Sequence, residues 1–196
     1  MKFKNILLIL IFLLSTINYS HSLEPDIFVQ STVNRASQVL SANMTKDEKI
    51  EKIKLIAKET VDIKGIGFYT LGAYRKGLTN IELEEYTKLF EKYFLKSFSS
   101  RLAEYSNPEI EVNSKEKLND NYTMVSSKLI ATAKRPEVNI DWRIYTKVPN
   151  NPIIRDLIIE GLSLARTQKE EFSSIINSND GDINILFDTL KDFAKQ

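Results

Sequence analysis

Residues 138–164 decide how we expect this chain to fold, and they read VNIDWRIYTKVPNNPIIRDLIIEGLSL. From Val138 to Tyr145 apolar and polar residues alternate, and this period of two is typical of a strand with one buried face. The run from Ile153 to Leu164 is rich in isoleucine and leucine, which favour strands. A Pro-Asn-Asn-Pro segment separates the runs, and such residues suit tight turns. The stretch therefore predicts an antiparallel hairpin.

The charges of the two runs predict how the hairpin strands pair. If Arg143 faces Asp156, then Trp142 faces Leu157, and one face of the hairpin is charged while the other is apolar. A slip by one residue would place Arg143 opposite Leu157 and mix the faces, which a half-buried sheet resists. The same register gives two further pairs: Asn139 with Glu160, and Ile140 with Ile159.

The N-terminus has the pattern of a secretory signal peptide. Two lysines near Met1 precede an apolar run from Ile6 to Leu14, which is too short to cross a bilayer as a helix of ~20 residues. Small residues follow at Ser20 and Ser22, so we expect cleavage after Ser22 and a single domain over residues 23–196. An uncleaved N-terminal anchor is the less favoured alternative.

Composition excludes several classes of site. The chain has no cysteine, and its single histidine lies in the predicted signal peptide, so Ser-His-Asp, Cys-His and the usual zinc sites are excluded. Residues 23–196 carry 25 basic and 26 acidic residues, which leaves no basic excess for nucleic acid. A hydrolase that uses two carboxylates remains formally possible. We expect no metal and no cofactor.

The order of predicted elements indicates an α+β fold. Helical spacing and capping patterns come first, four strand-like runs follow, and two helical segments end the chain; such segregation favours helices packed on one face of an antiparallel sheet. The expected helices are 25–40, one from Thr45, one ending near Gly72, 80–105, one capped by Thr167 with Glu170, and one from Asp182. The expected strands are 109–117, 122–134 and the two hairpin runs.

Two groups of residues have both a functional and a structural interpretation. Asp141, Arg143, Asp156 and Glu160 could form a carboxylate site or a docking surface, but an ion-pair ladder on a solvent-exposed face, at ~0.2–1 kcal/mol per pair, is favoured. The second group is the small inward face of the strand 122–134, opposite large helical side chains. It favours complementary packing, although a hollow for a lipid tail is the alternative. The inward residues of that strand are Val125, Ser127, Leu129, Ala131 and Ala133.

Several segments, in order, resemble the MlaC (toluene-tolerance auxiliary) family of periplasmic phospholipid-binding proteins. The segments are Val61-Asp62, Leu71-Gly72-Ala73-Tyr74-Arg75, the helix with Phe90, Phe94, Leu102 and Tyr105, Ile140-Asp141-Trp142-Arg143, and residues 155–164 followed by 167–172. Lys169 departs from the family pattern, which usually has an arginine at this position. An arginine could form a bidentate pair there, which a lysine does not. Together the segments cover most of residues 23–196.

The resemblance implies a non-enzymatic shuttle of the pathway that maintains lipid asymmetry. Such a shuttle would work in the periplasm and carry phospholipid between an outer-membrane lipoprotein–porin complex and an inner-membrane ABC transporter with a MlaD-type component. The implied fold is a curved, NTF2-like sheet with helices over its concave face and acyl tails between. We expect a monomer with bound phospholipid as cargo.

Periodicity, rather than the family, selects ten candidates for the lining of a lipid site. They are Phe68, Leu71, Phe90, Phe94, Leu129, Ile140, Trp142, Ile144, Leu157 and Ile159. Two competing hypotheses remain: an NTF2-like enzyme with a carboxylate pair inside the cavity, and a secreted adaptor that works through its surface.

Overall fold

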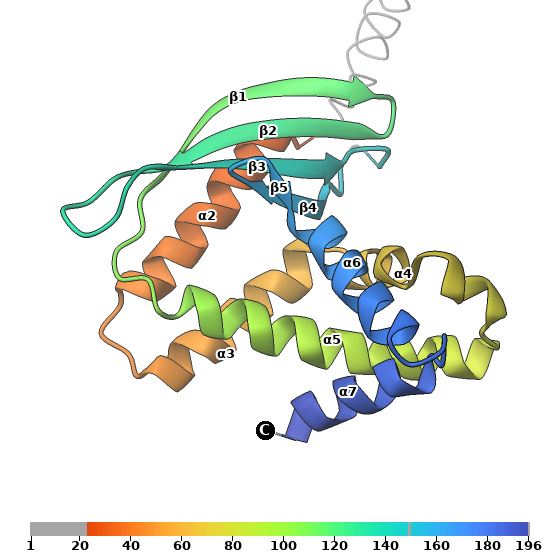
Figure 1. Ribbon diagram of the computed structural model, residues 1–196. Helices are drawn as coiled ribbons and strands as arrows, with labels where there is room; N and C mark the ends of the chain where they lie inside the picture. Colours follow the sequence, from red (N-terminus) through yellow and green to blue (C-terminus); the bar gives the residue numbers. More distant parts are fainter. Residues whose placement is uncertain (1–22, 149, 196) are drawn as a thin grey trace, which may run out of the picture.

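The computed structural model of this chain describes residues 23–148 and 150–195, and it shows an antiparallel sheet with helices on one side (Figure 1). The helices are α2 (Pro25–Ser41), α3 (Lys46–Thr60), α4 (Ile63–Leu71), the 3₁₀ helix η1 (Gly72–Gly77), α5 (Asn80–Leu102), α6 (Leu164–Asn177) and α7 (Asn184–Lys195). The strands are β1 (Ile110–Asn119), β2 (Tyr122–Leu129), β3 (Val138–Tyr145), β4 (Ile153–Ile159) and β5 (Leu162–Ser163). The predicted α+β class is therefore confirmed, with a short fifth strand added to the expected four.

The sheet is a meander in the order β1-β2-β3-β4-β5, and every neighbouring pair is antiparallel. The predicted hairpin is β3–β4, and its predicted register is confirmed at Arg143 opposite Asp156 and Trp142 opposite Leu157. A bulge then shifts the register by one, so that Ile144 pairs with Ile154. The extra residue is Arg155, and the alternation of apolar residues on β3 gave no sign of it.

Local capping sets the start of three helices. Thr45 with Glu48, and Thr79 with Glu82, form the two predicted capping boxes at the starts of α3 and α5. The side chain of Asp62 accepts a hydrogen bond from the Gly65 N–H and begins α4. These short polar contacts fix where each helix leaves the preceding chain.

Two predicted boundaries were wrong. Strand β2 ends at Leu129 rather than residue 134, and both alanines beyond it, Ala131 and Ala133, are exposed. The second hairpin strand ends at Ile159, because Glu160 and Gly161 both adopt positive φ angles, as a two-residue hairpin turn of this kind requires.

The start of α6 also differs from the prediction. Its N-cap is Ser163, whose side chain accepts from the Arg166 N–H, whereas Thr167 donates its hydroxyl to the Ser163 carbonyl. Helix α6 therefore begins one turn earlier than the Thr167–Glu170 pattern predicted, because the turn at residues 160–161 places Ser163 at the end of β5.

The helices form a layer beneath the sheet (Figure 1). Helix α2 packs against β1 and β2, while α6 packs against β4 and β5 at the other edge. The long helix α5 contacts α3, α4 and α7 and lies farther from the strands. Side chains from the sheet and from these helices meet in one large apolar cluster, which is the core.

Gly72 ends α4 in a conformation that favours glycine. Its φ is 55° and its ψ is −127°, and a Cβ built there would lie 2.9 Å from Cε of Lys169. We expect Gly72→Ala to lower the free energy of unfolding by about 2 kcal/mol, measured by urea denaturation. Gly77→Ala is the matched control, since no atom lies within 4 Å of its Cβ position, and it should change stability by less than ~0.5 kcal/mol. Equal effects of the two substitutions would contradict this explanation.

Candidate functional site

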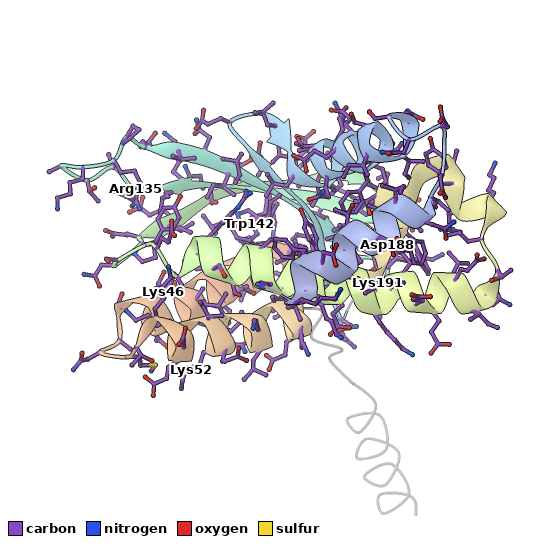
Figure 2. All side chains as sticks on the ribbon, turned by 60° about the horizontal axis from the view of Figure 1, so that its bottom comes forward. Lys46, Lys52, Arg135, Trp142, Asp188 and Lys191 are labelled. Carbon is purple, nitrogen blue, oxygen red and sulfur yellow. The ribbon has the colours of Figure 1, made fainter. Side chains whose placement is uncertain are left out.

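The apolar layer between the sheet and α5 is the first candidate site. On β2 and β3 alternate side chains are buried, and those of Val125, Ile140, Trp142 and Ile144 belong to the core cluster. Trp142 lies between the strands and α5, as Figure 2 shows. The layer is thus formed by the inward face of the sheet, as the period of two predicted.

The single tryptophan is held in this layer by one polar contact. Its indole Nε1 donates to Ser127 Oγ at 2.8 Å, and Ser127 Oγ donates to the Ile140 carbonyl at 3.0 Å. The chain of hydrogen bonds satisfies the buried N–H of the ring. Because this polar need is met within the sheet, the remaining surface of the ring is apolar.

Aromatic side chains of α5 form the opposite wall. The Phe90 ring lies 5.8 Å from Tyr86, 6.2 Å from Phe94 and 6.2 Å from Phe172, measured between ring centroids. Burial raises the pKa of the Tyr93 hydroxyl, so this group stays neutral at physiological pH. The wall therefore presents rings without a formal charge.

The structure brings most of the ten candidate lining residues together. Six are buried in the core cluster: Leu71, Phe90, Leu129, Ile140, Trp142 and Ile144. Phe94 and Leu157 are partly buried against it, and Ile159 is half-buried at the end of β4. Phe68 lies apart, because its ring contacts Lys64 and Arg75 at 5.5 and 5.0 Å on the other side of α4.

The layer becomes more exposed toward the β4–β5 turn. Leu157 and Ile159 are half-buried, and Ile159 pairs with Leu162, whose side chain is 69% exposed. Leu164, at the start of α6, is 40% exposed. Apolar side chains thus continue from the core to the surface at this edge, and we call Leu162 and Leu164 the apolar lip.

Polar contacts from β4 position the helices that flank the layer. Arg155, the bulge residue, forms an ion pair with Asp62 at 2.6 Å, while the Asp62 N–H donates to the Ile154 carbonyl. Asp156 was expected on a solvent-exposed face, but its side chain is 3% exposed. Adjacent residues of β4 therefore hold the start of α4 and the start of α6.

Asp156 is buried because the start of α6 covers it. Its carboxylate accepts from the Ser163 hydroxyl at 2.6 Å and from the Ala165 N–H at 3.0 Å, and Arg143 lies 3.3 Å away. An acidic group at a helix N-terminus is favourable for both the hydrogen bonds and the helix dipole. These partners account for Asp156 without a catalytic role.

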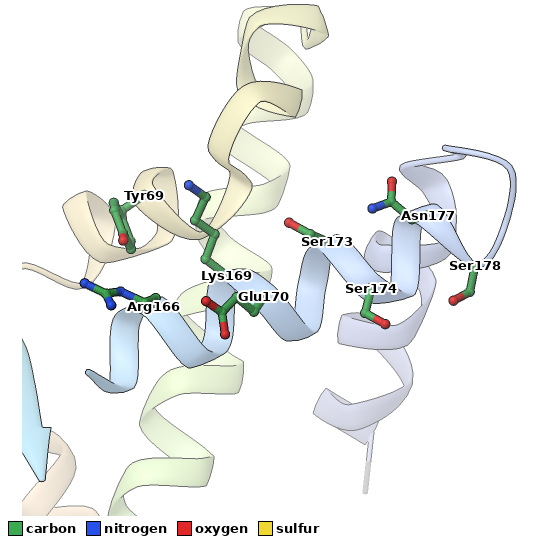
Figure 3. Close-up of a pocket in the computed structure, with 8 residues that line it drawn as sticks. All are labelled: Tyr69, Arg166, Lys169, Glu170, Ser173, Ser174, Asn177 and Ser178. Carbon is green, nitrogen blue, oxygen red and sulfur yellow. The ribbon is translucent and has the colours of Figure 1, made fainter. Parts of the chain in front are cut away.

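A second candidate site is a polar groove between α4 and α6 (Figure 3). Its volume is about 690 Å³. The residues that line it, which we call the α6 groove, are Tyr69, Arg166, Lys169, Glu170, Ser173, Ser174, Asn177 and Ser178. Another polar depression, of about 510 Å³, lies between α2 and the start of β1.

Sequence reasoning did not find the α6 groove or the apolar lip. Arg166, Lys169, Ser173 and Asn177 recur at spacings of three and four, which is a signal that they share one side of a helix. The prediction for that segment rests on its capping pattern and buried residues, which do not indicate an exposed groove. The lip was missed because Leu162 and Leu164 were assigned to a longer strand.

The described residues, 23–148 and 150–195, contain no group of three or more carboxylates or histidines that could hold a metal ion. Within the same ranges, none of the helices has the length and apolarity that are needed to span a bilayer.

The fold and the internal layer define an α+β protein in which helices cover one face of an antiparallel sheet and enclose an apolar core. One solved structure with this architecture is the phospholipid-binding protein from Ralstonia solanacearum in complex with a phospholipid. It aligns with a TM-score of 0.74 at 19% sequence identity, and the match covers 89% of this chain and 98% of that chain. The two proteins share a fold.

The sequence profile of the MlaC family, described as "MlaC protein", matches residues 30–192. This chain therefore belongs to the MlaC family, as the resemblance of its segments predicted. Proteins of this family are periplasmic, bind lipid and are not enzymes. The alternative of a carboxylate-pair enzyme is accordingly not retained.

Proposed function

We propose that this protein carries phospholipid through the periplasm with the acyl tails in the apolar layer between the sheet and α5. The observation that carries the proposal is the continuity of this layer, which runs from the buried Trp142 through the half-buried Leu157 and Ile159 to the exposed lip.

The energetics of hydrocarbon explain why a carrier needs such a layer. Burial of a methylene group is worth ~0.8 kcal/mol, so a 16-carbon tail in water costs roughly 12 kcal/mol. Walls of aliphatic and aromatic side chains offset this cost without any demand on the head group, which would lie near solvent. Affinity for the tails then comes with little head-group selectivity.

The layer must open to admit the tails, and the contacts between α5 and α6 suit this need. Tyr93 on α5 donates its hydroxyl to Gln168 on α6 at 2.8 Å, while both residues are only partly buried. One neutral hydrogen bond contributes about 1 kcal/mol, so its loss costs little. Opening would also separate the rings of Phe90 and Tyr93 from Phe172 of α6, and acyl tails would replace Phe172 as their apolar neighbour. The sheet-bound contacts of Asp62 and Asp156 would meanwhile keep α4 and α6 in place.

The pathway of this carrier follows from family membership as an inference. We expect a monomer of residues 23–196 that exchanges phospholipid with an inner-membrane ABC transporter, through its MlaD-type component, and with an outer-membrane lipoprotein–porin complex. The predicted signal peptide, residues 1–22, would direct export, and it lies outside the described residues.

Solvent extraction of the purified protein, followed by mass spectrometry, tests the proposal. We expect phospholipid to co-purify in an amount comparable to that of the protein, with several head groups represented. Protein that is folded but contains no phospholipid, and takes none from vesicles, would overturn it and favour the adaptor hypothesis.

A further inference from the structure

The α6 groove runs along α6 beside Tyr69 of α4, whereas the apolar lip lies where β5 meets the start of α6. Arg166 and Lys169 lie on the side of α6 next to Tyr69 of α4, as Figure 3 shows, whereas Gln168 contacts Tyr93 of α5. The groove is therefore separate from the layer that we assign to acyl tails. Any ligand of the groove can bind while the lipid site is occupied.

Cations in and beside the groove have no acidic partner in the part of the chain that the structure describes. Within the described residues no ion pair involves Arg166, Lys169, Arg75 or Lys76. Lys169 instead lies over the Tyr69 ring at 5.3 Å, and Arg75 lies over Phe68. Aromatic faces hold these cations in place but leave their positive charge uncompensated.

The polar lining indicates the shape of the ligand. From Arg166 to Ser178, the residue that follows α6, the groove extends over about 18 Å at 1.5 Å per residue. At ~3.3 Å per residue this length matches about five residues of extended polypeptide. The hydroxyl groups of Ser173 and Ser174 and the amide N–H of Asn177 can pair with the backbone of such a segment, while Asn177 Oδ1 already accepts from the Tyr74 hydroxyl.

The charged residues of the groove are concentrated at one end, so they would orient a charged ligand along α6. Arg166 and Lys169 lie at one end, Ser178 lies at the other, and Glu170 is the single acidic residue of the lining. The groove exposes only one large ring, Tyr69, so it offers little apolar surface for insertion into a membrane. Its two cations and its hydroxyl groups suit the carboxylates and the backbone of a peptide segment.

We propose that the α6 groove docks an extended acidic segment of a partner protein, with its carboxylates at Arg166 and Lys169. This inference rests on the proposed role as a carrier, because a carrier must meet proteins that supply and receive its cargo. It adds the chemistry of the recognised segment and the place where it binds. Docking there would leave the lip, where β5 meets α6, free for lipid transfer.

Fluorescence anisotropy of a labelled peptide tests this assignment. The probe is a twelve-residue peptide of alternating glutamate and glycine, measured at low salt against the full mature chain. We expect the double substitution Arg166→Glu and Lys169→Glu to raise the Kd at least tenfold. The matched control reverses Lys52 and Lys134, two exposed lysines that form no ion pair among the described residues, and should leave the Kd within about twofold.

Binding of the same variants to vesicles that contain phosphatidylglycerol is measured in parallel. Three outcomes would overturn the proposal: the unmodified protein does not bind the peptide, both double variants lose peptide affinity equally, or the Arg166→Glu and Lys169→Glu variant loses affinity for the vesicles but not for the peptide. The last result would assign the cations to a membrane surface. Phospholipid content is measured on the same preparations by mass spectrometry. Protein that binds the peptide but contains no phospholipid would refute the proposed lipid carriage alone. Protein that contains phospholipid but does not bind the peptide would refute only the proposed docking site.

Discussion

Asp156→Ala should lower the free energy of unfolding by about 3 kcal/mol, because the substitution breaks a buried network that joins β4 to α6. The carboxylate is the shared acceptor of Ser163 Oγ and the Ala165 N–H, and it lies beside Arg143. Alanine would leave the buried amide of Ala165 without its partner and would remove an N-terminal charge from α6. Loss of one partner of a buried charged network typically costs 3–5 kcal/mol, and the partial exposure of Arg143 places this case at the lower end.

Urea denaturation followed by circular dichroism measures this effect, with Asp141→Ala as the control. Asp141 is the aspartate of the adjacent strand, and its side chain forms no ion pair within the described residues. We expect the control to change stability by less than ~0.5 kcal/mol. A loss below 1 kcal/mol for Asp156→Ala would mean that α6 is held mainly by its apolar face.

Leu129→Trp should reduce the phospholipid content of the purified protein several-fold. Leu129 is buried on the inward face of β2, in the same cluster as Trp142 and Phe90, so a larger ring there takes space that acyl tails would use. Overpacking costs about 1–3 kcal/mol, which a stable domain tolerates. Phospholipid is counted by mass spectrometry, and urea denaturation confirms that the variant is folded.

Leu55→Trp provides the matched control, since Leu55 lies on α3 with 60% of its side chain exposed. The same chemical change at this position should leave phospholipid content unchanged. Unaltered phospholipid content in folded Leu129→Trp protein would show that Leu129 does not line the lipid site. The tails would then be expected closer to α5 and the lip.

Much of the fold could be predicted because the local sequence patterns and the alternation of apolar residues indicated the same helices and strands. The alternation on β3 and the Arg143–Asp156 pair fixed the hairpin register, and two Thr-to-Glu capping boxes fixed the starts of α3 and α5. In each case one local pattern had a single low-energy solution. These elements needed no knowledge of distant residues.

The rest depended on contacts that a linear pattern does not contain. The bulge at Arg155 allows that residue to reach Asp62, which lies far away in the sequence. The early start of α6 depends on the positive φ of Glu160, a residue that rarely adopts this conformation. Phe68 fits a helical apolar pattern, but cations cover its ring, so periodicity alone could not separate it from the core.

The most direct measurement of the central claim uses Trp142, the only tryptophan of the chain, as a reporter inside the apolar layer. Protein is loaded with phospholipid whose acyl chains carry bromine, a quencher that acts at short range, and its fluorescence is compared with that of protein loaded with unbrominated lipid. If the tails lie between the sheet and α5, the brominated lipid quenches most of the Trp142 emission. Stoichiometric binding of the brominated lipid with unchanged emission would contradict the account and place the tails elsewhere on the protein.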